Sequence, residues 1–162
     1  MFSDEIIKLS EDVLEHARKN NLQVVTAESC TGGLIIGVLT EIAGSSDVVD
    51  RGYITYSNLA KQQELGVNPE TLENHGAVSE ETALEMVSGA LNNSGCDIAV
   101  AVTGIAGPGG GTDTKPVGLV HIAVQKKEKP PIHKKCLFGD IGRDKVREAT
   151  VIAALELLNK TI

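Results

Sequence analysis

Residues 22–44 read LQVVTAESCTGGLIIGVLTEIAG, and this stretch decides the fold class. The run 22–27 is short, apolar and rich in β-branched residues, which is typical of a buried strand. The apolar stretch from residue 34 has the length of a helix and ends at Gly44. A polar segment, residues 28–33, joins the two. A strand that passes through a short loop directly into a helix predicts an α/β protein.

The rest of the chain continues this alternation. The expected helices span residues 4–20, 34–44, 58–65, 80–92 and 143–159, and the expected strands span 22–27, 52–57, 98–102, 117–125 and 132–138. The hairpin-length gap between the last two strands implies at least one antiparallel pair. No linker or internal repeat divides the chain. We therefore expect a single domain over residues 1–162, folded as a three-layer α/β/α sandwich with a mixed, mostly parallel sheet.

The composition excludes several classes of protein. The net charge is −7, and the chain has two Phe, two Tyr and no Trp, so it lacks the basic surface and the stacking aromatics of nucleic-acid binders. No apolar stretch reaches the roughly 18–20 residues that a membrane helix needs. The N-terminal segment lacks the basic and apolar regions of a signal peptide. We expect a cytoplasmic protein without nucleic-acid or membrane partners.

The cysteines and histidines show no pattern of metal ligands. The three cysteines are an odd number without a CxxC pair, which argues against a disulfide framework or a zinc knuckle. The four histidines lack a ligand spacing such as HExxH. The sequence therefore predicts neither a metal nor another cofactor.

The segment AESCTGG, residues 27–33, is the first candidate for chemistry. Backbone N–H groups collect where a strand loop enters a helix, and they suit an anion or a developing oxyanion. Ser29 is a candidate nucleophile there. The alternative is that Ser29 or Thr31 only caps the following helix, since both residue types are favoured caps. The segment matches neither the GxSxG elbow nor the Walker phosphate loop.

Cys30 is a rival nucleophile, because thiolates are activated at helix N-termini. Adjacent residues that leave a strand point in opposite directions, so only one of Ser29 and Cys30 should face the site. A free cysteine is more often a small core residue, and we expect that role for Cys30.

The second candidate is the segment from Tyr53 to Lys61. Tyr56 is expected to end a strand, Asn58 to begin a short helix, and Lys61 to share a helix face with Asn58. A lone lysine on a short helix is usually a solvated surface charge. To act as a general base, Lys61 would need burial or nearby cations to lower its pKa from the reference value of about 10.4.

The third candidate is the loop TGIAGPGGGTDTKPVG, residues 103–118, which holds six glycines. Thr103 and Gly104 lie at the carboxyl end of an apolar strand, where ligands gather in α/β sheets. The loop fails the GxGxxG fingerprint because Thr112 replaces the third glycine. The alternative to a ligand loop is a mobile surface hairpin.

The fourth candidate is the pair Arg143 and Arg147, which lie one turn apart on the last helix. Cations in the first turn of a helix oppose its dipole, at a cost of about 0.3–1 kcal/mol. This penalty suggests a carboxylate or phosphate ligand. Salt bridges to Asp140 or Asp144 are the alternative explanation.

Taken together, these segments resemble the C-terminal domain of the CinA (competence-damage-inducible protein A) family. The similar stretches include TAESCTGG, DVVDRGYITYSN with Lys61, HGAVS, AVAVTGIAGPGGG, KPVGLV and the RxxVR pattern that begins at Arg143. The resemblance covers essentially the whole chain, and its segments occur in the same order. Larger members carry a further N-terminal domain, so this chain resembles the stand-alone form.

The resemblance implies a nicotinamide mononucleotide amidohydrolase, which converts this mononucleotide to nicotinic acid mononucleotide and ammonia without a metal. It implies a homodimer with Ser29 as nucleophile, Lys61 as base and Tyr56 and Thr103 beside them. The expected substrate-binding residues are Cys30, Thr31, Gly32, Gly33, Asn58, Gly104 and Arg143. One departure is GDIGR at residues 139–143, where many members read GxR, and the extra residues could shift Arg143.

The chemistry of such a site can be matched to residues. The N–H groups of residues 30–33 are candidates for an oxyanion hole. Arg143, Arg147, Lys115 or the glycine loop would hold the phosphate. Two other functions stay open: a non-catalytic nucleotide-binding module, with Ser29 as a cap and Lys61 as a phosphate contact, and a structural or partner-binding domain.

Overall fold

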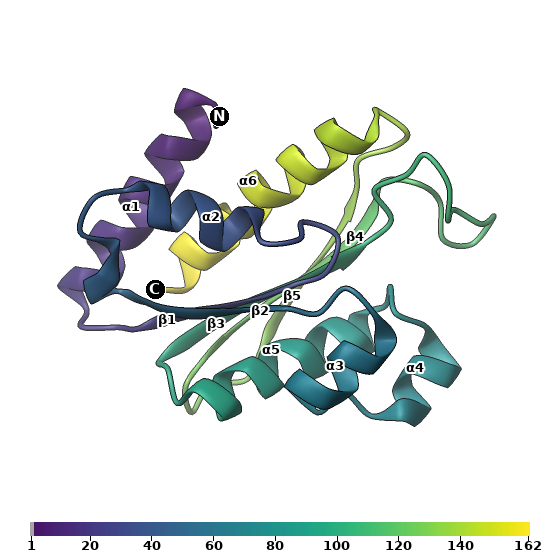
Figure 1. Ribbon diagram of the computed structural model, residues 1–162, viewed down its shortest axis with the longest axis horizontal. Helices are drawn as coiled ribbons and strands as arrows, with labels where there is room; N and C mark the ends of the chain where they lie inside the picture. The colour runs from purple at the N-terminus through teal and green to yellow at the C-terminus, as the bar shows by residue number, and fades with distance from the viewer. Residues whose placement is uncertain (1) are drawn as a thin grey trace.

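A five-stranded sheet lies between two layers of helices in the computed structural model, which describes residues 2–162 (Figure 1). The strands are β1 (Val24–Glu28), β2 (Val49–Ile54), β3 (Ile98–Gly104), β4 (Leu119–Lys126) and β5 (Ile132–Leu137). One layer contains α1 (Asp4–Lys19), α2 (Leu34–Glu41) and α6 (Arg143–Thr161), and the other contains α3 (Asn58–Leu65), α4 (Pro69–His75) and α5 (Glu80–Ser94). A 3-10 turn, Ser45–Asp47, precedes β2.

The strand order is β2-β1-β3-β4-β5. Strand β1 pairs in parallel with β2 and with β3, whereas β4 pairs antiparallel with β3 and with β5. Four of the five strands therefore run in one direction and β4 runs against them. The three-layer fold and the mixed, mostly parallel sheet are confirmed.

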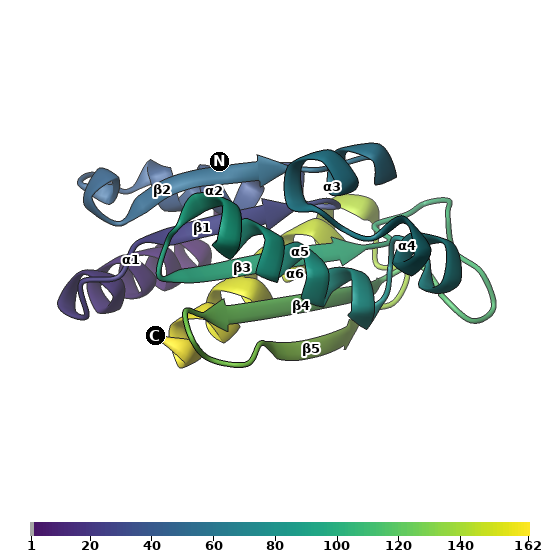
Figure 2. The same ribbon diagram turned by 90° about the horizontal axis from the view of Figure 1, so that it is seen from below.

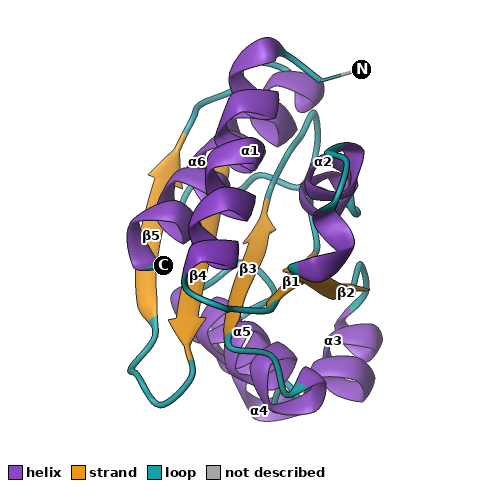
Figure 3. Ribbon diagram, turned by 90° about the vertical axis from the view of Figure 1, so that its left-hand side faces the viewer, coloured by secondary structure: helices purple, strands orange, loops and turns teal. Residues whose placement is uncertain are grey.

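The sheet has an apolar core on each face. Every residue of β1 is buried, as are the first six of β3, because helices cover both sides of these central strands. Alternate residues of β3 enter different cores: Val100 packs with the α1, α2 and α6 layer, and Ala101 packs with the α5 layer. Helices α1 and α6 lie side by side over their face (Figure 3). No helix among residues 2–162 is long and apolar enough to span a membrane.

Two elements differ from the prediction. The strand expected at 52–57 lies at Val49–Ile54, because pairing with β1 sets its register, and Tyr56 follows the strand instead of ending it. Helix α4 was not predicted, since its seven residues are too few to show a helical period. Its start is nevertheless marked in the sequence, because the Asn68 side chain accepts the N–H of Glu70 and Pro69 occupies the first turn.

The topology brings three loops to one edge of the sheet. Strands β1, β2 and β3 are parallel neighbours, and their carboxyl ends lie at the same edge (Figure 2). Ser29 follows β1, Thr55 and Tyr56 follow β2, and Thr103 lies at the end of β3. Ligand sites of open α/β sheets form at such an edge.

Candidate functional site

The Lys61 ammonium group lies beside the Ser29 hydroxyl at this edge. The Nζ atom of Lys61 is 3.1 Å from Oγ of Ser29 and 2.9 Å from the carbonyl oxygen of Thr55, to which it also donates. Nucleophile and base lie within this range in enzymes that activate a hydroxyl through a neighbouring amine. The two side chains are therefore close enough for direct proton transfer.

Helix α3 carries Lys61 into the interior. The Ser57 side chain caps the helix by accepting the N–H of Ala60, and Gly66 closes it in a left-handed conformation. Lys61 lies on the buried face and is only 1% exposed, so its interpretation as a solvated surface charge is wrong. Burial disfavours the ammonium form and lowers the pKa of Lys61 from its ordinary value.

A cavity of about 220 Å³ opens over this pair of residues. It is lined by Ser29, Cys30, Tyr56, Lys61, Ala77, Val78, Thr103, Gly104, Ala106 and Arg143. Seven of these residues were singled out from the sequence, and Ala77, Val78 and Ala106 were not. The loop before α5 supplies the first two of these three, and an apolar residue in a loop carries no sequence signal for a site.

Four residues expected to bind substrate do not line this cavity: Thr31, Gly32, Gly33 and Asn58. Asn58 begins α3 with its side chain exposed, on the outer side of the helix that buries Lys61. The side chain of Thr31 is fully buried and donates to Glu28. Asn58 and Lys61 were expected to share a helix face at the site, but of the two only Lys61 lines the cavity.

Arg143 reaches the cavity from the start of α6. Its guanidinium group donates to the Tyr56 hydroxyl at 2.8 Å and to the Gly107 carbonyl oxygen at 2.9 Å. Thr103 also lines the cavity, and its hydroxyl donates to the Ala77 carbonyl oxygen at 2.6 Å. The residues 139–143 thus place the Arg143 side chain at the cavity despite the longer GDIGR sequence.

A buried carboxylate that the sequence analysis missed organises the loop behind Ser29. Glu28 is fully buried and accepts five hydrogen bonds, from the hydroxyls of Thr26 and Thr31 and from the N–H groups of Gly33, Ile35 and Ile36. These donors include the first turn of α2, whose N-cap Gly33 has no side-chain bond. The acidic residue six positions before the first residue of α2 was the available sequence signal.

Glu28 overturns two expectations about this loop. Neither Ser29 nor Thr31 caps α2, because the Glu28 carboxylate occupies the helix N-terminus. The N–H of Gly33 is bonded to Glu28, and the N–H of Gly32 is bonded to the Ser29 carbonyl oxygen. The N–H groups of Gly32 and Gly33 are therefore not available to the oxyanion hole that was expected from residues 30–33.

Two backbone N–H groups of the loop, those of Cys30 and Thr31, donate to no backbone carbonyl oxygen among residues 2–162. Thr31 is fully buried, whereas Cys30 lines the cavity. Of these two N–H groups, the one that belongs to a residue lining the cavity is that of Cys30. The Cys30 thiol, in contrast, is not a candidate for chemistry. Burial raises its pKa to about 12, so it stays protonated near neutral pH.

The two arginines of α6 bind different partners. Arg147 does not line the Ser29 cavity; its guanidinium group donates to the carbonyl oxygens of Cys30, at 3.2 Å, and Thr31, at 2.9 Å. Within the described chain, neither Arg143 nor Arg147 forms a salt bridge with Asp140 or Asp144. Salt bridges to these aspartates therefore do not explain the two arginines at the start of α6.

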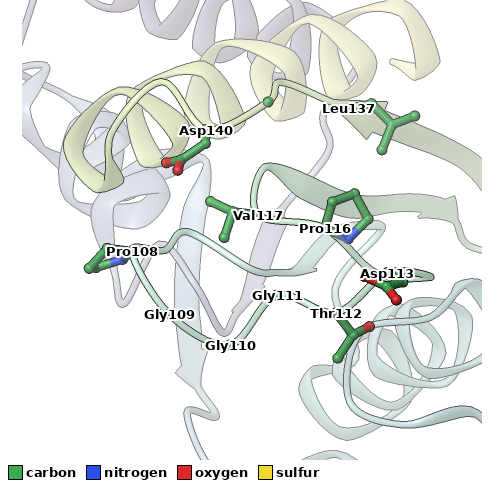
Figure 4. A pocket seen from close by; sticks show the side chains of 11 residues that line it. Pro108, Gly109, Gly110, Gly111, Thr112, Asp113, Pro116, Val117, Leu137 and Asp140 are labelled. Carbon is green, nitrogen blue, oxygen red and sulfur yellow. The ribbon is translucent and has the colours of Figure 1, made fainter.

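The glycine-rich loop forms a second, larger cavity of about 680 Å³ (Figure 4). It lies between residues 108–117 and residues 137–140, and the carboxylates of Asp113 and Asp140 line it. Lys115 does not line it; its ammonium group donates to the carbonyl oxygen of His75. Of the four groups considered for a phosphate, Arg143 and the start of the glycine loop (Thr103, Gly104 and Ala106) line the Ser29 cavity, whereas Arg147 and Lys115 do not. Residues 2–162 contain no group of three or more potential metal-ligating side chains.

Comparisons of this chain with known proteins agree on one family. Residues 6–162 match the family model described as the CinA C-terminal domain. A CinA-like protein of Kosmotoga olearia is 47% identical over 154 residues, which cover 95% of this chain and 37% of that protein. Nicotinamide-nucleotide amidohydrolase PncC of Escherichia coli K12 is 46% identical over 159 residues, which cover 98% of this chain and 95% of PncC.

A solved structure matches over nearly the same range. The competence/damage inducible protein CihA from Agrobacterium tumefaciens superposes with a TM-score of 0.96 at 55% identity, covering 98% of this chain and 96% of that one. The lengths of the relatives differ: the chain spans 37% of several curated relatives but nearly all of PncC.

Proposed function

This chain belongs to the CinA C-terminal domain family, and we propose that it hydrolyses the carboxamide of nicotinamide mononucleotide, releasing nicotinic acid mononucleotide and ammonia. The observation that carries the proposal is the 3.1 Å contact between the buried Lys61 ammonium nitrogen and the Ser29 hydroxyl. The name of the E. coli relative supplies the substrate, since that protein matches over 95% of its length.

The proposed reaction uses Ser29 and Lys61 as nucleophile and base. Neutral Lys61 takes the hydroxyl proton as Oγ of Ser29 attacks the carboxamide carbon. The oxyanion that forms accepts the N–H of Cys30, and Lys61 returns the proton to the departing ammonia. Water, deprotonated by Lys61, then attacks the ester carbon, and Lys61 returns that proton to Oγ of Ser29 as the ester bond breaks and the carboxylic acid leaves.

The other cavity residues would bind the substrate. The guanidinium group of Arg143 at the cavity has no carboxylate partner within residues 2–162, and such a group suits the phosphate of the mononucleotide. Tyr56 is held by Arg143 and Thr103 by Ala77, so both side chains are oriented before substrate arrives. Gly104 gives a ligand close access to the backbone.

We also propose a domain organisation, an oligomeric state and a cellular location for the protein. We expect residues 1–162, of which Met1 lies outside the described part, to act as one domain, since both apolar cores pack on the same sheet. A homodimer in the cytoplasm, without nucleic acid, fits the family resemblance and the net charge of −7. Exposed Ile54, Tyr56 and Leu59 at the end of β2 and the start of α3 are available for an apolar contact between subunits. Sedimentation of the purified chain tests the dimer.

Ammonia release from nicotinamide mononucleotide tests the activity. Ser29→Ala should reduce turnover about 10³-fold or more while substrate affinity, measured by calorimetry, stays unchanged. Ser88→Ala, which removes a hydroxyl bonded to Gln125 away from the cavity, is the matched control and should keep full turnover. Full function in Ser29→Ala would instead favour a nucleotide-binding module, and no ammonia release by the wild type would contradict the proposed activity.

A further inference from the structure

Two charged side chains hold complementary groups of the loop that carries Ser29. Glu28 accepts N–H groups on the helix side of the loop, and Arg147 donates to the carbonyl oxygens of Cys30 and Thr31. The loop also has backbone bonds of its own, from the Ser29 N–H to the Val102 carbonyl oxygen and from the Gly32 N–H to the Ser29 carbonyl oxygen. From Cys30 to Gly33 its shape depends on the side chains of Glu28 and Arg147 as well.

Arg147 affects the direction of the Cys30 N–H indirectly, through two peptide planes. A trans peptide is planar, so its N–H points opposite to its C=O. The Thr31 carbonyl is held by Arg147, and the N–H of the same peptide, that of Gly32, donates to the Ser29 carbonyl oxygen at 3.1 Å. The Ser29 carbonyl in turn sets the direction of the Cys30 N–H. The second contact of Arg147, to the Cys30 carbonyl, fixes the other side of Cys30.

Arg147 does not line the cavity at Ser29, which argues against a direct contact with a ligand there. Its guanidinium group lies outside the cavity and forms no salt bridge within residues 2–162. The adjacent Val146 is fully buried in the core, so packing of α6 holds the backbone of Arg147 in place. Arg143, one turn earlier, donates at the cavity itself. One helix thus supplies one arginine to the cavity and one to the loop behind it.

We propose that Arg147 is a positioning residue for amide hydrolysis: it never touches substrate, and it orients the Cys30 N–H toward the oxyanion by holding the Cys30 and Thr31 carbonyl oxygens. This inference rests on the proposed function, because it assigns a residue to the same reaction. It also replaces the expectation that Arg147 binds the substrate phosphate. Loss of Arg147 should therefore impair the chemical step and not substrate binding.

Kinetics of Arg147→Met test this role. We expect kcat to fall about 100-fold, as for a misplaced catalytic group, with KM within about twofold of the wild type. Added guanidinium ion should restore part of the lost kcat by occupying the vacated place. Arg147→Lys should be intermediate, since an ammonium group cannot bind both carbonyl oxygens with the fixed geometry of a guanidinium.

The matched control is Arg18→Met, which removes another guanidinium that donates to a backbone carbonyl, that of Gly44, and to Asp47. This variant should keep the wild-type kcat and show no response to guanidinium. A raised KM with unchanged kcat in Arg147→Met would assign the residue to substrate binding and overturn the proposal. So would an unchanged kcat. If Arg147→Met does not fold, Arg147→Lys provides the same comparison.

Hydrogen exchange separates failure of this inference from failure of the proposed function. The N–H groups of Gly32, Gly33, Ile35 and Ile36 are bonded within the loop, so their exchange reports its order without any substrate. Arg147→Met should speed their exchange, guanidinium should slow it again, and Arg18→Met should leave it unchanged. If the wild type releases no ammonia, the proposed function fails, but faster exchange would still support the positioning of the loop. Unchanged exchange would overturn it.

Discussion

The ammonium nitrogen of Lys61 lies 3.1 Å from the hydroxyl oxygen of Ser29, although 32 residues separate them in the chain. The other hydrogen-bond partner of this nitrogen is the Thr55 carbonyl oxygen, and within residues 2–162 no carboxylate pairs with it. A buried lysine without an anionic partner loses hydration without recovering it, so its neutral form is favoured. This is the protonation state that a general base needs.

Lys61→Arg should be nearly as inactive as Lys61→Ala, with turnover reduced about 10³-fold or more, while the phosphorylated substrate still binds. Guanidinium stays protonated at any working pH, so the variant keeps the positive charge but has no base. Ammonia release and calorimetric titration with nicotinamide mononucleotide measure the two properties. Substantial turnover by Lys61→Arg would contradict the proposed pair of Ser29 and Lys61.

The pH dependence gives a second measurement on Lys61. Its folded-state pKa lies below the ordinary value of 10.5, so activity should rise on the alkaline side as the proton leaves. The unfolded chain binds that proton more tightly, so the wild type gains stability as the pH rises toward 10.5. Lys61→Met lacks this gain. Its stability relative to the wild type, from urea titrations, should fall as the pH rises toward 10.5, and a constant difference would contradict the lowered pKa.

Cys30→Ala should keep most of the amidase activity and lower the unfolding free energy by about 1 kcal/mol. The thiol is buried, and its pKa is raised to about 12, so almost no thiolate is present near neutral pH. The proposed donor at this position is the backbone N–H, which the substitution leaves in place. A loss of turnover equal to that of Ser29→Ala would make Cys30 the nucleophile.

Chelators should leave the activity unchanged. The polar side chains of the Ser29 cavity are hydroxyls, one thiol, one amine and one guanidinium, and the described chain brings no three metal-ligating side chains together. Ammonia release is compared before and after dialysis against EDTA, and again after zinc is added. Loss with EDTA and recovery with zinc would show that a metal takes part.

Gly89→Ala should lower the unfolding free energy by about 3 kcal/mol and reduce turnover. A Cβ atom at Gly89 would lie 1.8 Å from the Leu65 carbonyl oxygen, so α5 would push α3 away and move Lys61 with it. Gly109→Ala is the control, because nothing lies within 4 Å of a Cβ there. Thermal unfolding and kcat are measured for both, and wild-type values for Gly89→Ala would show that the two helices yield without cost.

His121 should make the protein less stable at mildly acidic pH. Burial, the neighbouring His133 and Lys135 lower its pKa from 6.5 to about 4, and its Nδ1 is 2.9 Å from Nε2 of His133. The unfolded chain takes up the proton first, so stability is lost as the pH falls from about 6.5 to about 4. Urea titrations should show a smaller loss over this range for His121→Gln, and equal losses in both proteins would contradict the lowered pKa.

Local patterns in the sequence predicted most of the elements. Helix α5 illustrates this: Ser79 precedes Glu80 and Glu81, and the structure shows the Ser79 side chain accepting the N–H of Thr82. Helix α3 occurs at the predicted residues because Ser57 and Gly66 delimit it. The register of β2 and the existence of α4 were missed, since a strand register depends on its partner strand and seven residues are too few to show a period.

By itself, the sequence determined the fold class, the loop between a strand and a helix that carries Ser29, and Lys61, Tyr56, Thr103 and Arg143 as site candidates. Caps, turns and hydrophobic periods act between neighbours in the chain, so the sequence displays them directly. Which candidates meet depends on the packing of the folded chain. This packing buried Lys61 against Ser29, turned Thr31 to Glu28 and sent Arg147 to the loop carbonyl oxygens. Burial, and with it the pKa of a side chain, depends on segments that are distant in the chain and adjacent only after folding.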